Sequence, residues 1–332
     1  MTPTKDTHVT ESIETILSRL QAGPVLLDIG ASGEAPPLWR HIAPWSTIVG
    51  FDPDARGIAP AAHASFKRGV MVRKAVTSEA ASEVTFHLTR FPACSSTLAP
   101  DTKALGDYLF ADLFDVERQV TVPAITLDAA LQEQRLTGID WFKADSQGTD
   151  LRLFNDLNDD MRKRVLAVDV EPGLIDAYVH EDLFTDVHRN LLMQGFWLSD
   201  LTVRGSVRIR PSTARMAQSL APEITRERIE QRHKPSPGWC EARYLRTIDS
   251  IGGAHATERE YALLWVFAML DRQVAFALDV TESFRVRYAE NEMWRLMRDH
   301  AIAELRRLAL ARTPADGLPR RIARRIRRML CG

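Results

Sequence analysis

The chain is poor in features that define several broad classes of protein. Only three of its 332 residues are cysteines, and Cys94, Cys240 and Cys331 lie too far apart for a Cys-x-x-Cys pair. This spacing argues against a zinc knuckle and a disulfide framework, and it is typical of a reducing compartment. The formal net charge is only -1, which excludes a basic coat over the whole protein. We therefore expect no nucleic-acid partner.

Long apolar runs are also lacking. The longest, from Ala262 to Leu270, is too short to span a bilayer, and the polar N-terminus shows no secretory signal. We therefore expect a cytoplasmic protein. Because 45% of the residues are hydrophobic, the chain can still bury a core large enough for one domain and an extension.

Two stretches near the N-terminus have the pattern of buried strands that end in polar turns. Residues 25–34, Val-Leu-Leu-Asp-Ile-Gly-Ala-Ser-Gly-Glu, predict a strand that runs into a glycine turn. Residues 48–53, Ile-Val-Gly-Phe-Asp-Pro, predict a second strand that ends in an acid. A strand, a glycine turn, a helix and an acid-tipped second strand form the nucleoside-binding half of a doubly wound sheet.

Two cofactors compete for this pattern. A dinucleotide site requires Gly-x-Gly-x-x-Gly, but the first glycine position is Asp28, whose carboxylate would repel a diphosphate. S-adenosylmethionine has no phosphate and carries cationic groups, so a carboxylate suits it. We expect Gly30, Ser32 and Gly33 to pass close to its amino-acid end, and Asp52 to accept hydrogen bonds from its ribose. We therefore favour S-adenosylmethionine over a dinucleotide.

Two later stretches repeat the pattern of a strand followed by acids. Asp145 and Gln147 follow the strand that begins near residue 139, and Asp169 and Glu171 lie at the end of the strand that begins near residue 165. The carboxyl ends of parallel strands meet at one edge of a sheet, where ligands bind. We therefore expect these side chains at the same edge as the two earlier acids.

The combination of these motifs resembles the FkbM family of S-adenosylmethionine-dependent methyltransferases. The resemblance covers roughly residues 24–210 and is carried by residues 27–33 (Leu-Asp-Ile-Gly-Ala-Ser-Gly), 50–53 (Gly-Phe-Asp-Pro), 126–128 (Thr-Leu-Asp) and 139–150. It implies a seven-stranded methyltransferase fold and O-methylation of a hydroxyl, often on a sugar of a glycan or natural product. It also implies that Asp145 and Gln147 lie at the cofactor pocket.

The chain departs from the family pattern at one important position. Where the family usually has Asp-x-Glu-Gly-x-Glu, residues 145–150 read Asp-Ser-Gln-Gly-Thr-Asp. Gln147 keeps the shape and hydrogen-bonding reach of glutamate but not its charge. The alternative function is therefore a catalytically degenerate protein that binds the cofactor or a glycan as a scaffold.

Methyl transfer to a hydroxyl needs a base that takes the proton as the oxygen attacks. We predict Asp145 as this base, with Asp169 and Glu171 as the other candidates. An alternative is that the three carboxylates hold a divalent cation that acidifies the hydroxyl. We favour the direct base, and so expect no metal.

We divide the chain into an N-terminal helix (1–23), a methyltransferase domain (24–211) and a helical C-terminal extension (212–332). The fold class expected for the middle part is α/β, a doubly wound, Rossmann-like sheet of seven strands. Residues 196–198 and 207–209, separated by a turn at Arg204-Gly205, predict a closing antiparallel hairpin.

The C-terminal extension contains helices that we expect to pack on the core or on a second subunit of a homo-oligomer. A capping box at residues 257–260, Thr-Glu-Arg-Glu, marks the start of an apolar helix. Six arginines and one apolar stripe in residues 319–332 suit contact with an anionic membrane surface. A solvated tail and contact with RNA are the alternatives for this segment.

Overall fold

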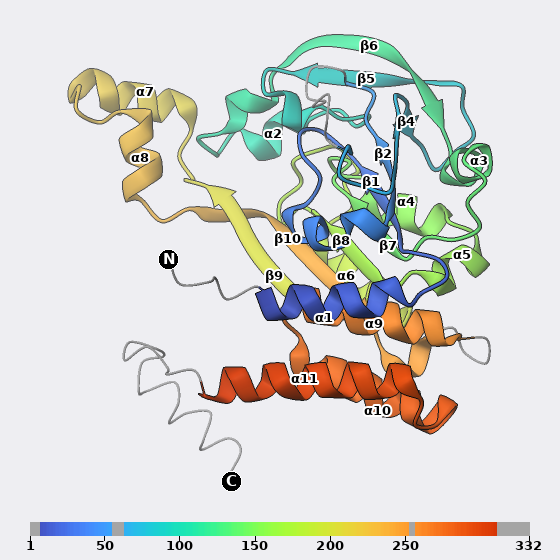
Figure 1. Cartoon of the computed structure of the whole chain (residues 1–332). Helices are drawn as coiled ribbons and strands as arrows, with labels where there is room; N and C mark the ends of the chain where they lie inside the picture. Colours follow the sequence, from blue (N-terminus) through green and yellow to red (C-terminus); the bar gives the residue numbers. More distant parts are fainter. Residues whose placement is uncertain (1–6, 55–62, 252–255, 311–332) are drawn as a thin grey trace.

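The core of the protein is a seven-stranded sheet in the order β3-β2-β1-β7-β8-β10-β9 (Figure 1). The structure, a computed structural model, describes residues 7–54, 63–251 and 256–310. The strands are β1 (Val25–Ile29), β2 (Thr47–Phe51), β3 (Arg68–Val72), β7 (Trp141–Ala144), β8 (Ala167–Val170), β9 (Phe196–Ser206) and β10 (Ser236–Arg246). β10 is antiparallel to both of its neighbours, and the other pairs are parallel. The predicted α/β class with a mostly parallel sheet of seven strands is confirmed, and the order is compatible with a Rossmann-like fold.

The antiparallel part of the sheet differs from the predicted hairpin. β9 runs without a break through Arg204 and Gly205 and pairs with β10, which follows 30 residues later in the chain. A Cβ atom on Gly205 would lie 1.8 Å from the carbonyl oxygen of Ser236, so the glycine allows two strands to approach rather than forming a turn. The hairpin with residues 207–209 is therefore wrong, and the sheet extends past the predicted boundary at residue 211. The helices α7 (Pro211–Leu220) and α8 (Arg226–Arg232) connect the two strands.

The link between β1 and β2 also differs from the prediction. Two short 3-10 turns, Pro37–His41 and Ala43–Trp45, stand where we expected a helix. Pro36, Pro37 and Pro44 lack backbone N–H donors and their rings hinder the preceding turn of an α-helix. No α-helix therefore follows the glycine turn of β1.

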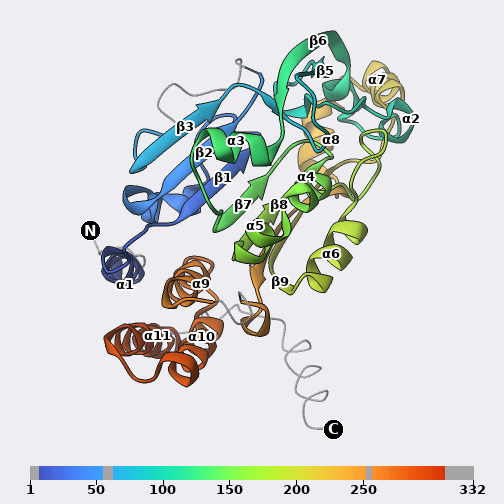
Figure 2. The same cartoon turned by 90° about the vertical axis from the view of Figure 1, so that its right-hand side faces the viewer.

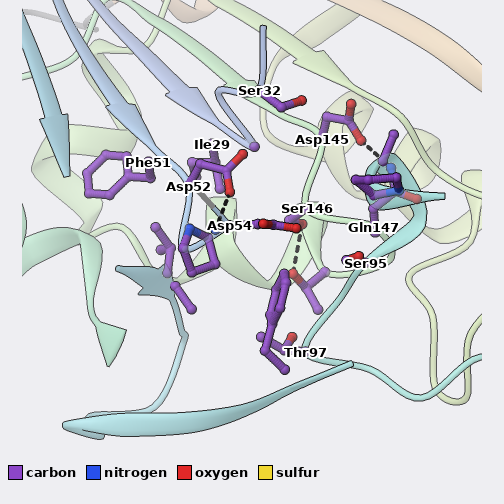
Figure 3. A pocket seen from close by; sticks show the side chains of 18 of the residues that line it. Ile29, Ser32, Phe51, Asp52, Asp54, Ser95, Thr97, Asp145, Ser146 and Gln147 are labelled. Carbon is purple, nitrogen blue, oxygen red and sulfur yellow. Dashed lines mark hydrogen bonds between the residues drawn. The ribbon is translucent and has the colours of Figure 1, made fainter. Parts of the chain in front are cut away.

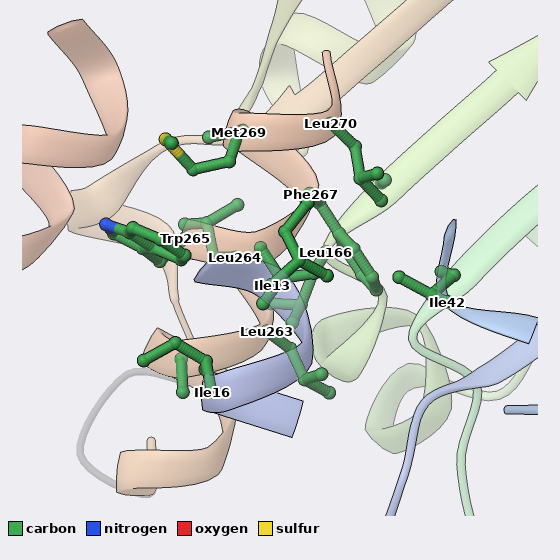
Figure 4. Close-up of a cluster of buried hydrophobic side chains, with 14 of the residues drawn as sticks. Ile13, Ile16, Ile42, Leu166, Leu263, Leu264, Trp265, Phe267, Met269 and Leu270 are labelled. Atoms are coloured by element: carbon green, nitrogen blue, oxygen red, sulfur yellow. The ribbon is translucent and has the colours of Figure 1, made fainter. Parts of the chain in front are cut away.

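The helices α9 (Glu258–Leu270) and α1 (Thr7–Ser18) together cover one face of the seven-stranded sheet. Every residue from Tyr261 to Leu270 is buried, because the sheet lies on one side of α9 and helices lie on the others. Figure 4 shows its side chains packed against Ile13 and Ile16 of α1. The ring centroid of Phe267 lies 4.7 Å from that of Trp141 in β7. The expected capping box is present, with the Thr257 N–H donating to Glu260 at 2.6 Å.

Two further helices lie outside α9, namely α10 (Val274–Tyr288) and α11 (Glu292–Leu310) (Figure 2). The opposite face of the sheet is covered by α3 (Leu127–Glu133), α4 (Asp150–Asp156), α5 (Asp159–Arg164) and α6 (Phe184–Met193). The C-terminal helices thus pack on the sheet of their own chain.

A smaller sheet and a short helix lie near the carboxyl ends of the parallel strands. The sheet consists of β4 (Ala75–Val76), β5 (Glu83–Thr89) and β6 (Val116–Ile125) in the order β4-β6-β5. The helix is α2 (Thr102–Leu105), which Asp101 caps through the N–H groups of Lys103 and Ala104. Side chains of these elements lie over the carboxyl ends of the parallel strands.

Within the described ranges, no helix combines the length and apolar character that crossing a bilayer requires. The basic segment 319–332, for which we predicted membrane contact, lies outside the described residues.

Phe267→Ala should lower the free energy of unfolding by about 3–5 kcal/mol, because it leaves a cavity between α9 and the sheet. Urea denaturation checks this, with Val286→Ala as control, since Val286 in α10 is 80% exposed and should change stability little. A Phe267 variant as stable as the wild type would show that α9 is not part of the core.

Candidate functional site

A cavity of 390 Å³ lies at the carboxyl ends of β1, β2 and β7 (Figure 3). Most of the residues that we predicted to bind the cofactor line it: Gly30, Ser32, Gly33, Asp52, Asp145 and Gln147. Asp52 lies on one side of the cavity, and Asp145 and Gln147 lie on the other. The smaller sheet contributes Ala75, Val76 and Phe86 to the wall.

The turn after β1 is packed directly against the turn after β7. A Cβ atom on Gly30 would lie 2.1 Å from the carbonyl oxygen of Asp145, and Gly30 has a φ of 77°, so only glycine fits here. The Asp145 N–H donates to the Ile29 carbonyl at 2.9 Å, and the Gly30 N–H donates to Phe51 at 2.9 Å. These contacts bring the ends of three strands together around the cavity.

Asp52 follows β2 and is a buried carboxyl that faces the cavity. Its pKa is raised to about 6, chiefly by burial and also by the nearby charges of Asp54 and Asp145, while a hydrogen bond from the Asp54 N–H lowers it. That bond joins the Asp54 nitrogen to Asp52 Oδ1 at 2.7 Å. At neutral pH the carboxyl is ionised and can accept hydrogen bonds from a pair of hydroxyls.

A second cavity, of 310 Å³, shares part of its wall with the first. The shared residues are Phe91, Ala93, Asp145 and Gln147. The rest of its wall includes Glu171, Tyr178, Trp239 and the rings of Phe110 and Phe114. Ligands in the two cavities would therefore meet at Asp145.

Gln147 is held by hydrogen bonds at both ends of its amide. Its Nε2 donates to Asp145 Oδ1 at 2.5 Å, and its Oε1 lies 2.7 Å from the Tyr178 hydroxyl. Its backbone has a φ of 58°, and its carbonyl accepts from Ser96 Oγ at 2.7 Å. The amide of Gln147 therefore donates to Asp145 and accepts from Tyr178 at the same time.

Glu171 lies next to Asp145 and is held protonated. Its pKa is raised to about 9, chiefly by burial and also by the charge of Asp145 and a hydrogen bond between the two side chains. Its Oε1 accepts from Trp239 Nε1 at 3.0 Å. Glu171 is therefore neutral at physiological pH.

Asp28 and Asp169, both predicted for the site, line neither of these two cavities. Asp28, Lys143, Asp169 and Arg243 lie side by side in register across β1, β7, β8 and β10, with alternating charges. Lys143 Nζ lies 2.7 Å from Asp28 Oδ1, and Arg243 Nε lies 2.7 Å from Asp169 Oδ1. Because alternate residues of a strand point to opposite faces, Asp28 points to the face covered by α9, unlike its neighbours Leu27 and Ile29.

The three carboxylates of the metal alternative line one further cavity, of 300 Å³, but differ in their partners. Asp169 is paired with Arg243, while Asp145 and Glu171 lie at the second cavity. Among the described residues, no three histidine, cysteine, aspartate or glutamate side chains are arranged to hold a metal ion.

The aromatic residues of the second cavity were not predicted from the sequence. Phe110 and Phe114 precede β6, Tyr178 precedes α6, and Trp239 lies in β10, so the chain brings them together from three separate segments. No local spacing signals this arrangement.

No protein-family model matches the chain, and no curated protein matches it. The likeness to the FkbM family therefore rests on the motifs themselves.

The titration of Glu171 predicts a pH dependence of stability. The folded protein holds this proton up to a pKa of about 9, whereas the unfolded chain releases it near 4.5. The stability that neutral Glu171 confers is thus fully present below pH 4.5 and is lost as the pH rises through 9. Glu171→Gln has no such proton, so its free energy of unfolding should not fall in this way as the pH rises. Its stability relative to the wild type should therefore increase with pH, by up to about 1.4 kcal/mol per pH unit.

Urea denaturation at several pH values between about 5 and 8 tests this difference. Glu14→Gln, at an exposed position of α1, is the matched control and should follow the wild type. A constant difference between Glu171→Gln and the wild type across this range would mean that Glu171 is already ionised.

Proposed function

We propose that the protein is an S-adenosylmethionine-dependent methyltransferase that acts on a hydroxyl group. The observation that carries the proposal is the position of Asp145, which lies in the wall between a cavity suited to a nucleoside and a second cavity. A methyl donor in one cavity and an acceptor in the other would place the reacting atoms beside a carboxylate.

The first cavity suits a nucleoside that lacks phosphate. Asp52, Asp54 and Asp145 line it and outnumber the lysine of its lining, Lys74, so a diphosphate would be repelled. The 3-10 turns after β1 also remove the helix N-terminus on which a dinucleotide's pyrophosphate usually rests. Asp52 would bind the ribose hydroxyls, and Gly30 and Gly33 would lie against the amino-acid end. When bound, S-adenosylmethionine supplies an electrophilic methyl group.

The proposed role of Asp145 is to accept the acceptor's proton. The acceptor oxygen forms a bond to the methyl carbon while the bond from that carbon to sulfur breaks, and the sulfur keeps the electron pair. The hydroxyl proton passes to the Asp145 carboxylate, which Gln147 holds in place through its amide. Glu171, protonated beside it, limits the negative charge at this point.

We propose that the proton leaves through a third cavity. Asp145 and Glu171 both line this cavity, of 300 Å³, which Lys143, Asp169 and Arg243 of the charged row also line. With ligands in the first two cavities, the third would still connect Asp145 to solvent.

The alternative function, a degenerate protein that binds without catalysis, rested on the missing charge of Gln147. The hydrogen bonds of Gln147 to Asp145 and Tyr178 give this side chain a defined role in the site. This observation favours the catalytic function over the scaffold.

Asp52→Ala should weaken the binding of S-adenosylhomocysteine by roughly 10-fold or more, because it removes a charged hydrogen-bond acceptor. Isothermal titration calorimetry measures the effect, and Asp159→Ala is the matched control, since this aspartate is 71% exposed on α5. An Asp52→Ala variant with unchanged affinity would contradict the assignment of the cavity.

Binding should also depend on pH through Asp52. The ionised carboxylate is the form that accepts hydrogen bonds, so affinity should rise as the pH rises toward the pKa of about 6 and level off above it. The same titrations repeated with Asp52→Asn should show no such rise. A wild-type affinity that falls over this range would mean that the protonated carboxyl binds the ligand.

A further inference from the structure

The second cavity is lined mostly by apolar side chains. Asp145 and Gln147 lie where it meets the first cavity, and Glu171 and Glu181 are the other carboxyls of its lining. The other lining side chains are mostly apolar, and they include Leu113, Ile175 and several aromatic rings. An occupant would therefore meet hydrocarbon over most of its surface.

Four aromatic rings form a continuous wall of this cavity. The ring centroids of Trp239 and Phe110 lie 6.0 Å apart, those of Phe110 and Phe114 lie 5.2 Å apart, and those of Phe114 and Tyr178 lie 5.6 Å apart. The last two pairs meet edge to face, the geometry that aromatic rings prefer. Another flat ring can extend such a wall through the same contacts.

Most polar side chains around the cavity already have partners within the protein. The Trp239 N–H donates to Glu171, and the single proton of the Tyr178 hydroxyl is shared between Gln147 Oε1 and the Cys94 carbonyl. Glu181 accepts from the N–H groups of Ala177 and Tyr178. Spare capacity remains on the carboxylate of Asp145, on Glu171 and on the second N–H of Gln147, and also on the carboxyl of Glu181. A hydroxyl at Asp145 would find partners, whereas hydroxyls that face the aromatic wall would not.

The charge of the lining is also informative. Among the described residues that line this cavity, there is no lysine, arginine or histidine. A phosphate or carboxylate on the acceptor would have no cation to pair with and would face Asp145.

We propose that the second cavity binds an uncharged hydroxylated aromatic compound, with its ring against Phe110, Phe114 and Trp239 and its hydroxyl at Asp145. This inference rests on the proposed methyltransferase function and names the class of acceptor. It differs from the sugar that the family resemblance implies, because the hydroxyls around a sugar ring would face the apolar wall of this cavity without partners. A phenol also gives up its proton readily, at a pKa of about 10 in the case of tyrosine, so a carboxylate is a suitable base.

Calorimetric titration with two probes tests the proposal. Naphthol and methyl glucoside are each titrated into wild-type protein that is saturated with S-adenosylhomocysteine. Naphthol should bind roughly 10-fold or more tightly than the glucoside, whose additional hydroxyls would be left without partners. Naphthol should also quench tryptophan fluorescence, because Trp239 lines the cavity.

Two variants with the same chemical change locate the binding. Phe114→Leu keeps apolar volume but removes a ring of the wall, and should weaken naphthol binding roughly 2- to 10-fold. Phe276→Leu is the matched control, since Phe276 packs on Trp197 at 5.0 Å, away from the cavity, and should bind naphthol like the wild type.

The results separate the two proposals. If the wild type does not bind S-adenosylhomocysteine, the proposed function fails. If it binds S-adenosylhomocysteine but not naphthol, or binds the glucoside as tightly as naphthol, the aromatic acceptor is overturned while the methyltransferase proposal stands. Equal weakening by Phe114→Leu and Phe276→Leu would overturn the assignment of naphthol to this cavity.

Discussion

The contact between the backbones of Gly30 and Asp145 is the constraint on which the site depends. A side chain at residue 30 would overlap the Asp145 carbonyl, so the turns after β1 and β7 can meet only with glycine there. This contact, with the hydrogen bond from Asp145 to Ile29, places Asp145 beside the first cavity. From the same turn, Gln147 reaches Asp145 on one side and Tyr178 on the other. The turn after β7 therefore forms part of the wall of both cavities.

The sequence predicted the α/β class and the polar residues that follow the strands, because strand ends and glycine turns are encoded locally. It did not predict which way Asp28 points, since that depends on strand alternation and on the register that sets Lys143 beside it. Nor did it reveal β10, which inserts between β8 and β9 after the excursion through α7 and α8. Phe114, Tyr178 and Trp239 come together only through tertiary contacts, so no local sequence motif predicts the second cavity.

The prolines after β1 and the C-terminal helices together determine which segment covers the sheet next to β1 and β2. Because the chain forms only 3-10 turns between β1 and β2, α9 from the far end of the sequence covers the sheet there with α1. The burial of α9 on all sides reflects this position between the sheet and an outer layer of helices. A segment that reads as an extension in the sequence thus completes the core, and it leaves the carboxyl edge of the sheet free for ligands.

The central claim is that Asp145 faces both a methyl donor and its acceptor. A crystal structure of the protein soaked with S-adenosylmethionine tests it most directly. The account predicts ribose hydroxyls on Asp52 and the methyl group directed at the wall formed by Asp145 and Gln147. Ligand bound elsewhere, or bound in the cavity with its methyl group directed away from Asp145, would contradict it.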